Sequence, residues 1–168
     1  MPLLKADGGE KTAGWLFIYA CRHALVPHVE SAVAAVLGGV SIWQWQEQSL
    51  VPQSVRAEVR WRGPAGRGST LASTLRMFPG LYAEITSEPT SDQMGMRYAL
   101  VPQLGLWSGA MDSLGETMLG QERVHAAMSL PPEQMRQELE RILGRPWDEV
   151  LEPLRRTEGQ PTTLLRVV

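Results

Sequence analysis

A glycine-rich turn is the stretch of this sequence whose residue types are best suited to binding a ligand. Residues 63–68 follow an alternating segment and precede a helical pattern that Ser69 opens. Backbone N–H groups at a helix N-terminus attract anions, and the guanidinium of Arg67 adds positive charge. Nearby basic or titratable side chains extend the same site. The candidate anion-binding residues are Gly66, Arg67, Gly68, Ser69, Arg60 and His28.

The glycine spacing excludes the two common phosphate-binding motifs. A Walker loop needs Gly-Lys-Ser/Thr, and a dinucleotide-binding turn needs GxGxxG with an acidic residue after the next strand. Neither pattern occurs at residues 63–70. The alternative interpretation is a tight strand-to-helix connection that simply requires glycine.

A second group of residues has metal-binding side chains without metal-binding spacing. Cys21, His23, His28 and Glu30 lie within ten residues and match no zinc pattern. His28 and Glu30 are two positions apart on a predicted helix, so their side chains point in different directions. We therefore predict surface histidines at a helix start, and no metal or other cofactor.

Arginines and aromatic residues fall on one face of the predicted sheet. Residues 55–62 alternate apolar with charged side chains, so an inward apolar set leaves the arginines on the opposite face. This face has three alternative interpretations. It is covered by C-terminal helices bearing Trp147, Leu151 and Leu154, it forms a dimer or other protein interface, or it lines a small-ligand cleft. Stacking of RNA bases is a further alternative, but no RNP-like signature is present. The candidate interaction face consists of Trp43, Trp45, Arg56, Arg60, Arg62 and Tyr82.

The sequence contains no common catalytic motif. Neither G-x-S-x-G, H-E-x-x-H nor a paired-carboxylate motif occurs, and the only histidines are His23, His28 and His125. An acid–base pair assembled in space, such as His28 with Glu84, stays open. We therefore predict a non-enzymatic protein, with a small enzyme near His28, Arg60 and Arg67 as the alternative.

Length and composition indicate one globular domain. The chain has 168 residues, 43% of them hydrophobic and 20% charged, with a formal net charge of -2. This charge favours neither nucleic acid nor anionic membrane. The apolar run at residues 15–21 is too short to span a bilayer, and the single cysteine fits a reducing compartment. A cytoplasmic location is the resulting expectation.

The hydrophobic periodicity predicts an α+β fold with a ferredoxin-like βαββαβ core. Residues 15–20, apolar throughout, should form a central strand. The other core elements are strands at 40–47, 55–62 and 81–87 and helices at 27–37 and 69–78. A hairpin with strands at 97–102 and 105–111 follows, then helices at 121–128, 131–143 and 146–156 and a strand at 162–168. The predicted organisation is a flexible leader, 1–13, and a single domain, 14–168, divided into the core 14–87, a hairpin extension 88–120 and a C-terminal part 121–168.

Four stretches of the chain resemble a known family. These stretches are ALVPHVESAVAAVLG, VRAEVRWRGPAGRGSTLASTLR, ITSEP and RYALVPQLGLW. Together they resemble the uncharacterised actinobacterial family catalogued as domain of unknown function 3145, over roughly residues 15–168. The leader departs from the family, and Val26 stands where the family has a cysteine. The resemblance implies an intracellular protein and brings no activity, ligand or catalytic residue.

The sequence therefore predicts a non-enzymatic binding or regulatory protein. Its expected partner is a small anionic ligand or a protein, including a second copy of the chain as a homodimer. No membrane association is expected, and RNA binding is the least favoured alternative.

Overall fold

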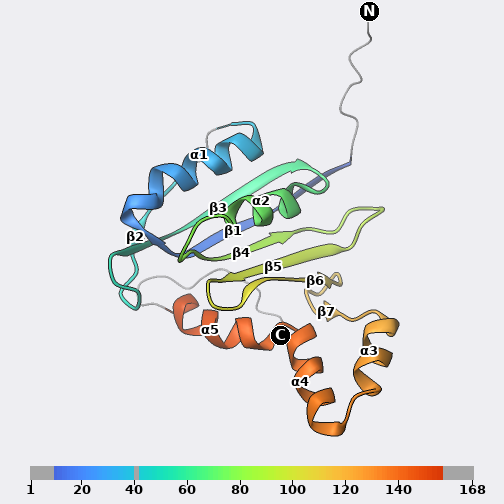
Figure 1. Ribbon diagram of the computed structural model, residues 1–168. Coiled ribbons are helices and arrows are strands. Elements are labelled where there is room, and N and C mark those ends of the chain that lie inside the picture. Colours follow the sequence, from blue (N-terminus) through green and yellow to red (C-terminus); the bar gives the residue numbers. More distant parts are fainter. Residues whose placement is uncertain (1–9, 40–41, 157–168) are drawn as a thin grey trace, which may run out of the picture.

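The computed structural model describes residues 10–39 and 42–156, which form one sheet with helices on both faces (Figure 1). Seven antiparallel strands follow the order β2-β3-β1-β4-β5-β6-β7 across it. The strands are β1 (Lys11–Arg22), β2 (Gln46–Glu47), β3 (Ser54–Pro64), β4 (Tyr82–Ser87), β5 (Gly95–Val101), β6 (Gly105–Met111) and β7 (Thr117–Met118). The five α-helices in these residues are α1 (Val26–Leu37), α2 (Arg67–Leu75), α3 (Gln121–Met128), α4 (Pro132–Ile142) and α5 (Arg145–Arg155). The mixed helix and strand class predicted from the sequence is confirmed.

β1 is a central strand of the sheet and is buried on both faces. It pairs with β3 on one side and with β4 on the other. Every residue from Leu16 to Cys21 is buried. An unbroken apolar run produces this placement because a strand with two covered faces has no position at which a polar side chain reaches water. The central position predicted for residues 15–20 is confirmed.

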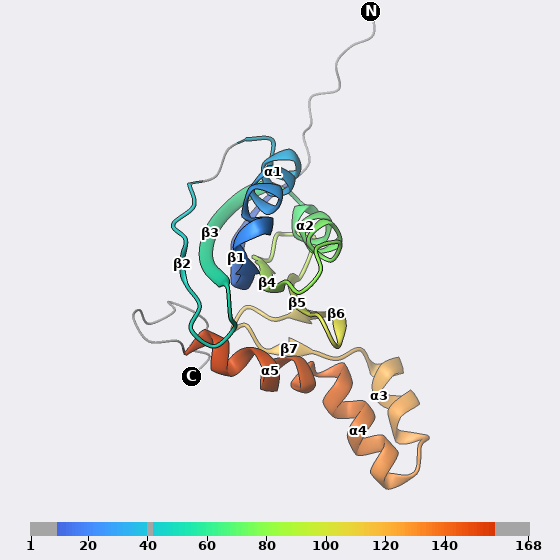
Figure 2. The ribbon, with the colours of Figure 1, turned by 60° about the vertical axis from the view of Figure 1, so that its left-hand side comes forward.

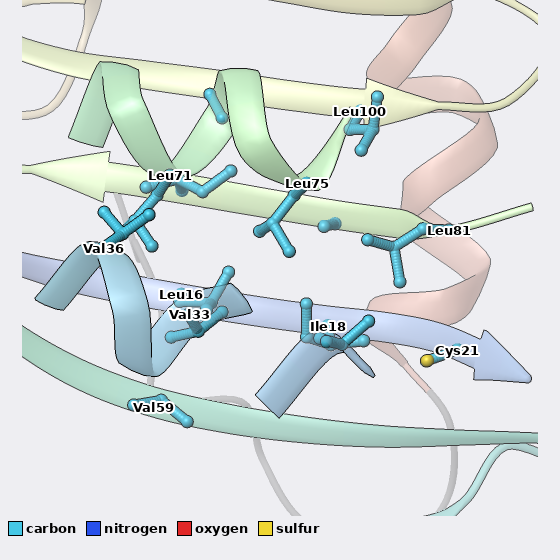
Figure 3. Close-up of a cluster of buried hydrophobic side chains, with 14 of the residues drawn as sticks. Leu16, Ile18, Cys21, Val33, Val36, Val59, Leu71, Leu75, Leu81 and Leu100 are labelled. Atoms are coloured by element: carbon cyan, nitrogen blue, oxygen red, sulfur yellow. The ribbon is translucent and has the colours of Figure 1, made fainter. Parts of the chain in front are cut away.

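α1 and α2 cover one face of the sheet, and the main hydrophobic core lies beneath them (Figures 2 and 3). Leu16 and Ile18 of β1 pack here against Val33 of α1 and Leu71 of α2. A register shift after Ile18 turns Cys21 to this face as well, although strict alternation would have placed it on the other. Burial raises the pKa of the Cys21 thiol to about 11, which keeps it protonated and unreactive.

α5 covers part of the opposite face, which we call the outer face (Figures 1 and 2). Phe17 and Tyr19 of β1 and Trp107 of β6 form a second core there. Three side chains of α5 close this core from above, namely Trp147, Leu151 and Leu154. The prediction that these three residues pack over part of the arginine-bearing face is confirmed.

The predicted strand at 40–47 is largely wrong. Residues 40–41 lie outside the described part of the chain; of residues 42–47, Gln46 and Glu47 alone pair with β3, and 42–45 are irregular. The rings of Trp43 and Trp45 stack at 5.0 Å between centroids, and the Trp45 indole donates to Glu30 of α1 at 2.7 Å. These contacts hold the segment against the helix layer in place of a backbone ladder.

Other boundaries move by a few residues. β1 begins at Lys11, inside the predicted leader, because residues 11–14 continue the ladder with β3. Residues 1–9 and the predicted strand at 162–168 lie outside the described residues. The predicted hairpin and the three C-terminal helices are confirmed within two residues at each end.

The C-terminal helices follow a path from the sheet edge back to the outer face. α3 and α4 project away from the sheet, and α5 returns beneath β5 and β1 (Figures 1 and 2). Among residues 10–39 and 42–156, no helix is long and apolar enough to cross a membrane.

Candidate functional site

The glycine turn serves mainly as a connection between β3 and α2. Gly66 has a φ of 90°, a left-handed conformation that favours glycine at this position. Gly68 is buried, and a Cβ on it would lie 3.5 Å from the ring of Trp61 and 3.5 Å from that of Tyr98. Gly66 is thus favoured by its backbone conformation, whereas a Cβ at Gly68 would make only ordinary van der Waals contacts with the sheet.

The space beside this turn is too small for an organic anion. The cavity has a volume of about 40 Å³ and is lined by Gly66, Gly68 and Ser69 together with side chains that include Thr12 and Tyr98. That volume has room for about one to three water molecules. Arg67 does not point into it, since its guanidinium donates to the Val36 carbonyl at the end of α1.

The six candidate anion-binding residues are not brought together. His28 is exposed at the start of α1, which follows the Arg22 end of β1. The glycine turn follows the Pro64 end of β3, opposite Lys11 at the other end of β1. Arg60 lies on the outer face, whereas Arg67 bonds to α1 on the helix side.

The residues considered for an enzyme are separated in the same way. His28, Arg60 and Arg67 occupy three different surfaces. Glu84 is only 3% exposed and lies beneath α5, so it does not pair with His28.

The candidate interaction face divides into three parts. Trp43 and Trp45 lie on the α1 side of the sheet instead of the outer face, because they pack against the main core. Arg56 is buried and donates to the Leu154 carbonyl of α5 at 3.2 Å. The remaining three, Arg60, Arg62 and Tyr82, keep some exposure to solvent.

A buried cluster of charges holds α5 on the outer face, and the sequence analysis did not identify it. Glu84 of β4 accepts hydrogen bonds from the Tyr19 hydroxyl at 2.8 Å and from Arg155 of α5 at 3.0 Å. It also pairs with Arg97 of β5, which reaches Asp148 of α5. The available signal was the charge at positions 148 and 155, since these flank Leu151 on the inward stripe of the helix.

Each charge in this cluster is compensated by an opposite one. Burial, reinforced by the charge of Glu84, raises the pKa of the Tyr19 hydroxyl well above its usual value. Burial alone would raise the pKa of Asp148, but hydrogen bonds and charges from Arg97 and Arg155 lower it. Such a cluster fixes the position of α5 because removing one member leaves another buried without a partner. We assign it a structural role.

The outer face is open at its other end, around Trp15. The rings of Trp15, Phe17 and Tyr19 form a row along β1, with centroid separations of 5.8 and 6.1 Å. Phe17 and Tyr19 are fully buried, whereas Trp15 is half-buried. Arg60 lies over the Trp15 ring at 5.5 Å and forms an ion pair with Glu88 at 3.0 Å.

Trp15 lines a groove with a volume of about 280 Å³, which we call the Trp15 groove. It lies between β1, the loop 88–94 and the turn 111–115. Its apolar lining includes Trp15, Pro89, Met111 and Leu114, and its carboxylates are Glu88 and Asp112. A second hollow of about 360 Å³ continues along the same loop and adds Asp92 and Met94.

Hydrogen bonds hold both walls of the groove in place. The Glu10 carboxylate accepts from the backbone N–H and the hydroxyl of Ser91, each at 2.7 Å. These bonds lower the pKa of Glu10. Asp112 accepts backbone N–H groups of Leu114 and Glu116 at 2.8 and 2.9 Å, which shapes the turn 111–115. The groove is therefore preorganised for binding.

The groove combines apolar and acidic side chains. Its lining includes no histidine or cysteine, so it offers neither a thiolate nor an imidazole base. In residues 10–39 and 42–156, no three His, Cys, Asp or Glu side chains are placed to hold a metal ion. The sequence analysis assigned Trp15 only to a buried strand, and Arg60 is the one predicted anion-binding residue that lies at this groove.

Comparison with known proteins identifies one related family. The family model described as "Protein of unknown function (DUF3145)" matches residues 15–167. This match confirms the resemblance found in the sequence. No curated protein and no solved structure matches the chain.

Proposed function

Because this chain belongs to the DUF3145 family, whose description gives no function, we propose its role from its own surface: a non-enzymatic binding domain that recognises a protein partner through the Trp15 groove. The observation that carries this proposal is the uneven cover of the outer face. α5 closes one end, and a groove of about 280 Å³ lies at the other. A concave, largely apolar site with a few polar groups is typical of a binding site.

Apolar side chains beside the groove are exposed to water, and their burial by a partner would be favourable. Leu114 is 73% exposed and Met94 is 49% exposed, and both line the hollows around the loop 88–94. Burying one such side chain against a partner contributes roughly 1.5–3 kcal/mol. Neighbouring exposed apolar residues in a groove therefore favour association.

The charges favour the protein partner over the small anionic ligand that the sequence also predicted. Carboxylates of Glu88 and Asp112 line the groove, and Arg60 at its rim is already paired. The glycine turn, which carried the anion prediction, encloses only about 40 Å³.

The finer description of the fold belongs to the same proposal. We infer a ferredoxin-like core for residues 14–87. The order β2-β3-β1-β4 in antiparallel pairs, with α1 and α2 on one face, supports it. A cytoplasmic location is supported by the single, buried Cys21.

Selection from a random dodecapeptide display library tests the proposed function. The full chain should enrich a consensus peptide, and the synthetic peptide should bind Trp15→Ala at least tenfold more weakly. Met77→Ala, which removes an exposed apolar side chain beyond α2, serves as the control and should bind as the wild type does. Failure to enrich any peptide, or equal binding by Trp15→Ala, refutes the proposal.

A further inference from the structure

We propose that the Trp15 groove recognises a peptide segment that carries basic side chains next to apolar ones. This inference rests on the proposed function and adds the chemical class of the partner.

The first support is the charge of the groove and its continuation. Three carboxylates line the two hollows, from Glu88, Asp92 and Asp112, and no lysine or arginine lines either. Arg60 compensates Glu88 through their 3.0 Å ion pair. Within the part of the chain that the structure describes, neither Asp92 nor Asp112 forms an ion pair. Asp92 and Asp112 therefore present negative charge that no described basic side chain pairs with, and this charge complements a basic ligand.

The second support is the mixture of acidic and apolar groups on the same walls. Met111 and Leu114 lie next to Asp112 in the turn 111–115, and Met94 lies two residues from Asp92. Lysine and arginine have long apolar stems that pack on such surfaces while their charged ends reach carboxylates. A leucine or valine beside them would fill the groove between Trp15, Met111 and Leu114.

The third support is the direction of the charge along the outer face. Arg60 and Arg62 lie on β3, which β1, β4 and β5 separate from β6 and the turn 111–115 that follows it. Their charge repels a basic side chain from the β3 side, and the two aspartates attract it toward the loop 88–94. The partner is thus oriented with its basic groups at the Asp92 and Asp112 end.

Three labelled nonapeptides test this inference by fluorescence anisotropy with the full chain. They alternate leucine with arginine, with glutamine or with glutamate, and are otherwise identical. The arginine peptide should bind about tenfold tighter than the glutamine peptide, and tighter still than the glutamate peptide. Added salt should weaken it most, because its binding includes exposed ion pairs.

Variants that remove only a negative charge test whether Asp92 and Asp112 attract the arginine peptide. The double variant Asp92→Asn, Asp112→Asn keeps an acceptor oxygen at both positions and should lower the affinity for the arginine peptide about five- to tenfold. Glu133→Gln removes a carboxylate from exposed α4 and should leave the affinity unchanged. Trp15→Ala should also weaken binding.

The outcomes separate the two proposals. Binding of the glutamine or glutamate peptide that is as tight as that of the arginine peptide, and that depends on Trp15, overturns the basic partner but leaves the groove as a binding site. An unchanged affinity in the double aspartate variant also overturns the basic partner. If no peptide shows binding that depends on Trp15, both proposals fail.

Discussion

The two ends of the outer sheet face carry one continuous row of aromatic rings but opposite arrangements of charge. At the α5 end, Phe17 and Tyr19 are buried and the carboxylate of Glu84 is paired with two arginines. At the other end, Trp15 is half-buried beside carboxylates, and Asp112 has no ion pair among the described residues. The same aromatic row is therefore core where a helix supplies compensating charges, and the partly exposed wall of a groove where it does not.

This difference also explains why the buried arginines are not candidates for ligand binding. Arg56 donates to the Leu154 carbonyl of α5, and Arg97 pairs with Asp148 of α5. A ligand could reach them only by displacing the helix and its apolar side chains. Accessibility, more than residue type, distinguishes the two ends.

Neutralising the central carboxylate of the closed end should strongly destabilise the fold. Glu84→Gln leaves Arg97 and Arg155 buried beside a neutral side chain, so the free energy of unfolding should fall by about 3 kcal/mol. Urea denaturation followed by tryptophan fluorescence measures it. Glu140 lies on α4 and is 3.9 Å from its nearest arginines, with a side chain that is 41% exposed. Glu140→Gln should therefore change stability by less than about 0.5 kcal/mol. A loss of similar size in both variants would contradict the structural role of the cluster.

Truncating the aromatic row should separate stability from binding. Phe17→Ala should lower the free energy of unfolding by about 3–5 kcal/mol, since it leaves a cavity under α5. Trp15→Ala should cost only about 1–2 kcal/mol because part of that side chain is exposed. Peptide binding should show the reverse order when both variants are compared below their melting temperatures. Equal stability losses would remove the contrast between the two ends.

Acid should weaken the closed end. The pKa of Asp148 is below its ordinary 3.8 in the folded protein because Arg97 and Arg155 stabilise its charge more than burial opposes it. Its contribution to stability is therefore present above about pH 3.8 and is lost as the pH falls through the lower folded-state pKa. Melting temperatures measured from pH 6 to pH 2.5 should fall less steeply in Asp148→Asn than in the wild type. Parallel curves of melting temperature against pH would show that Asp148 does not cause the loss of stability in acid.

Neutralising a carboxylate at the open end should have the smallest effect on stability. Asp112→Asn keeps the oxygen that accepts the N–H groups of Leu114 and Glu116, so the turn 111–115 should persist. We expect the free energy of unfolding to change by less than about 0.5 kcal/mol in the urea assay. A loss as large as that of Glu84→Gln would mean that the groove carboxylate is structural.

Local periodicity predicted most of the elements because it reports which face of a segment is buried. The alternation at residues 55–62 and the apolar run at 15–20 gave their strands correctly. The segment 40–47 also has apolar side chains at alternate positions, yet of its described residues, 42–47, only Gln46 and Glu47 pair with β3. There, Trp45 bonds to Glu30 of α1, a contact that no local pattern contains.

The candidate sites were less predictable because their members come from distant parts of the chain. Trp15 meets Glu88 and Asp112 only through the pairing of β1 with β4, β4 with β5, and β5 with β6. Glu84 lies on the outward face of β4, and it is buried because α5 lies over that face. The prediction of outward arginines is confirmed for Arg56, Arg60 and Arg62, and of these three α5 covers Arg56 alone.

The sequence by itself determined the family, the mixed helix and strand class, the central place of β1 and the inward faces of α1, α2 and α5, because each depends on residue types at short spacing. The tertiary structure alone decided which arginines are buried, that the glycine turn encloses too little space for an organic anion, and that a groove opens at Trp15. These features depend on which distant segments meet, and contacts between distant segments form only when the sheet and its two helix layers assemble.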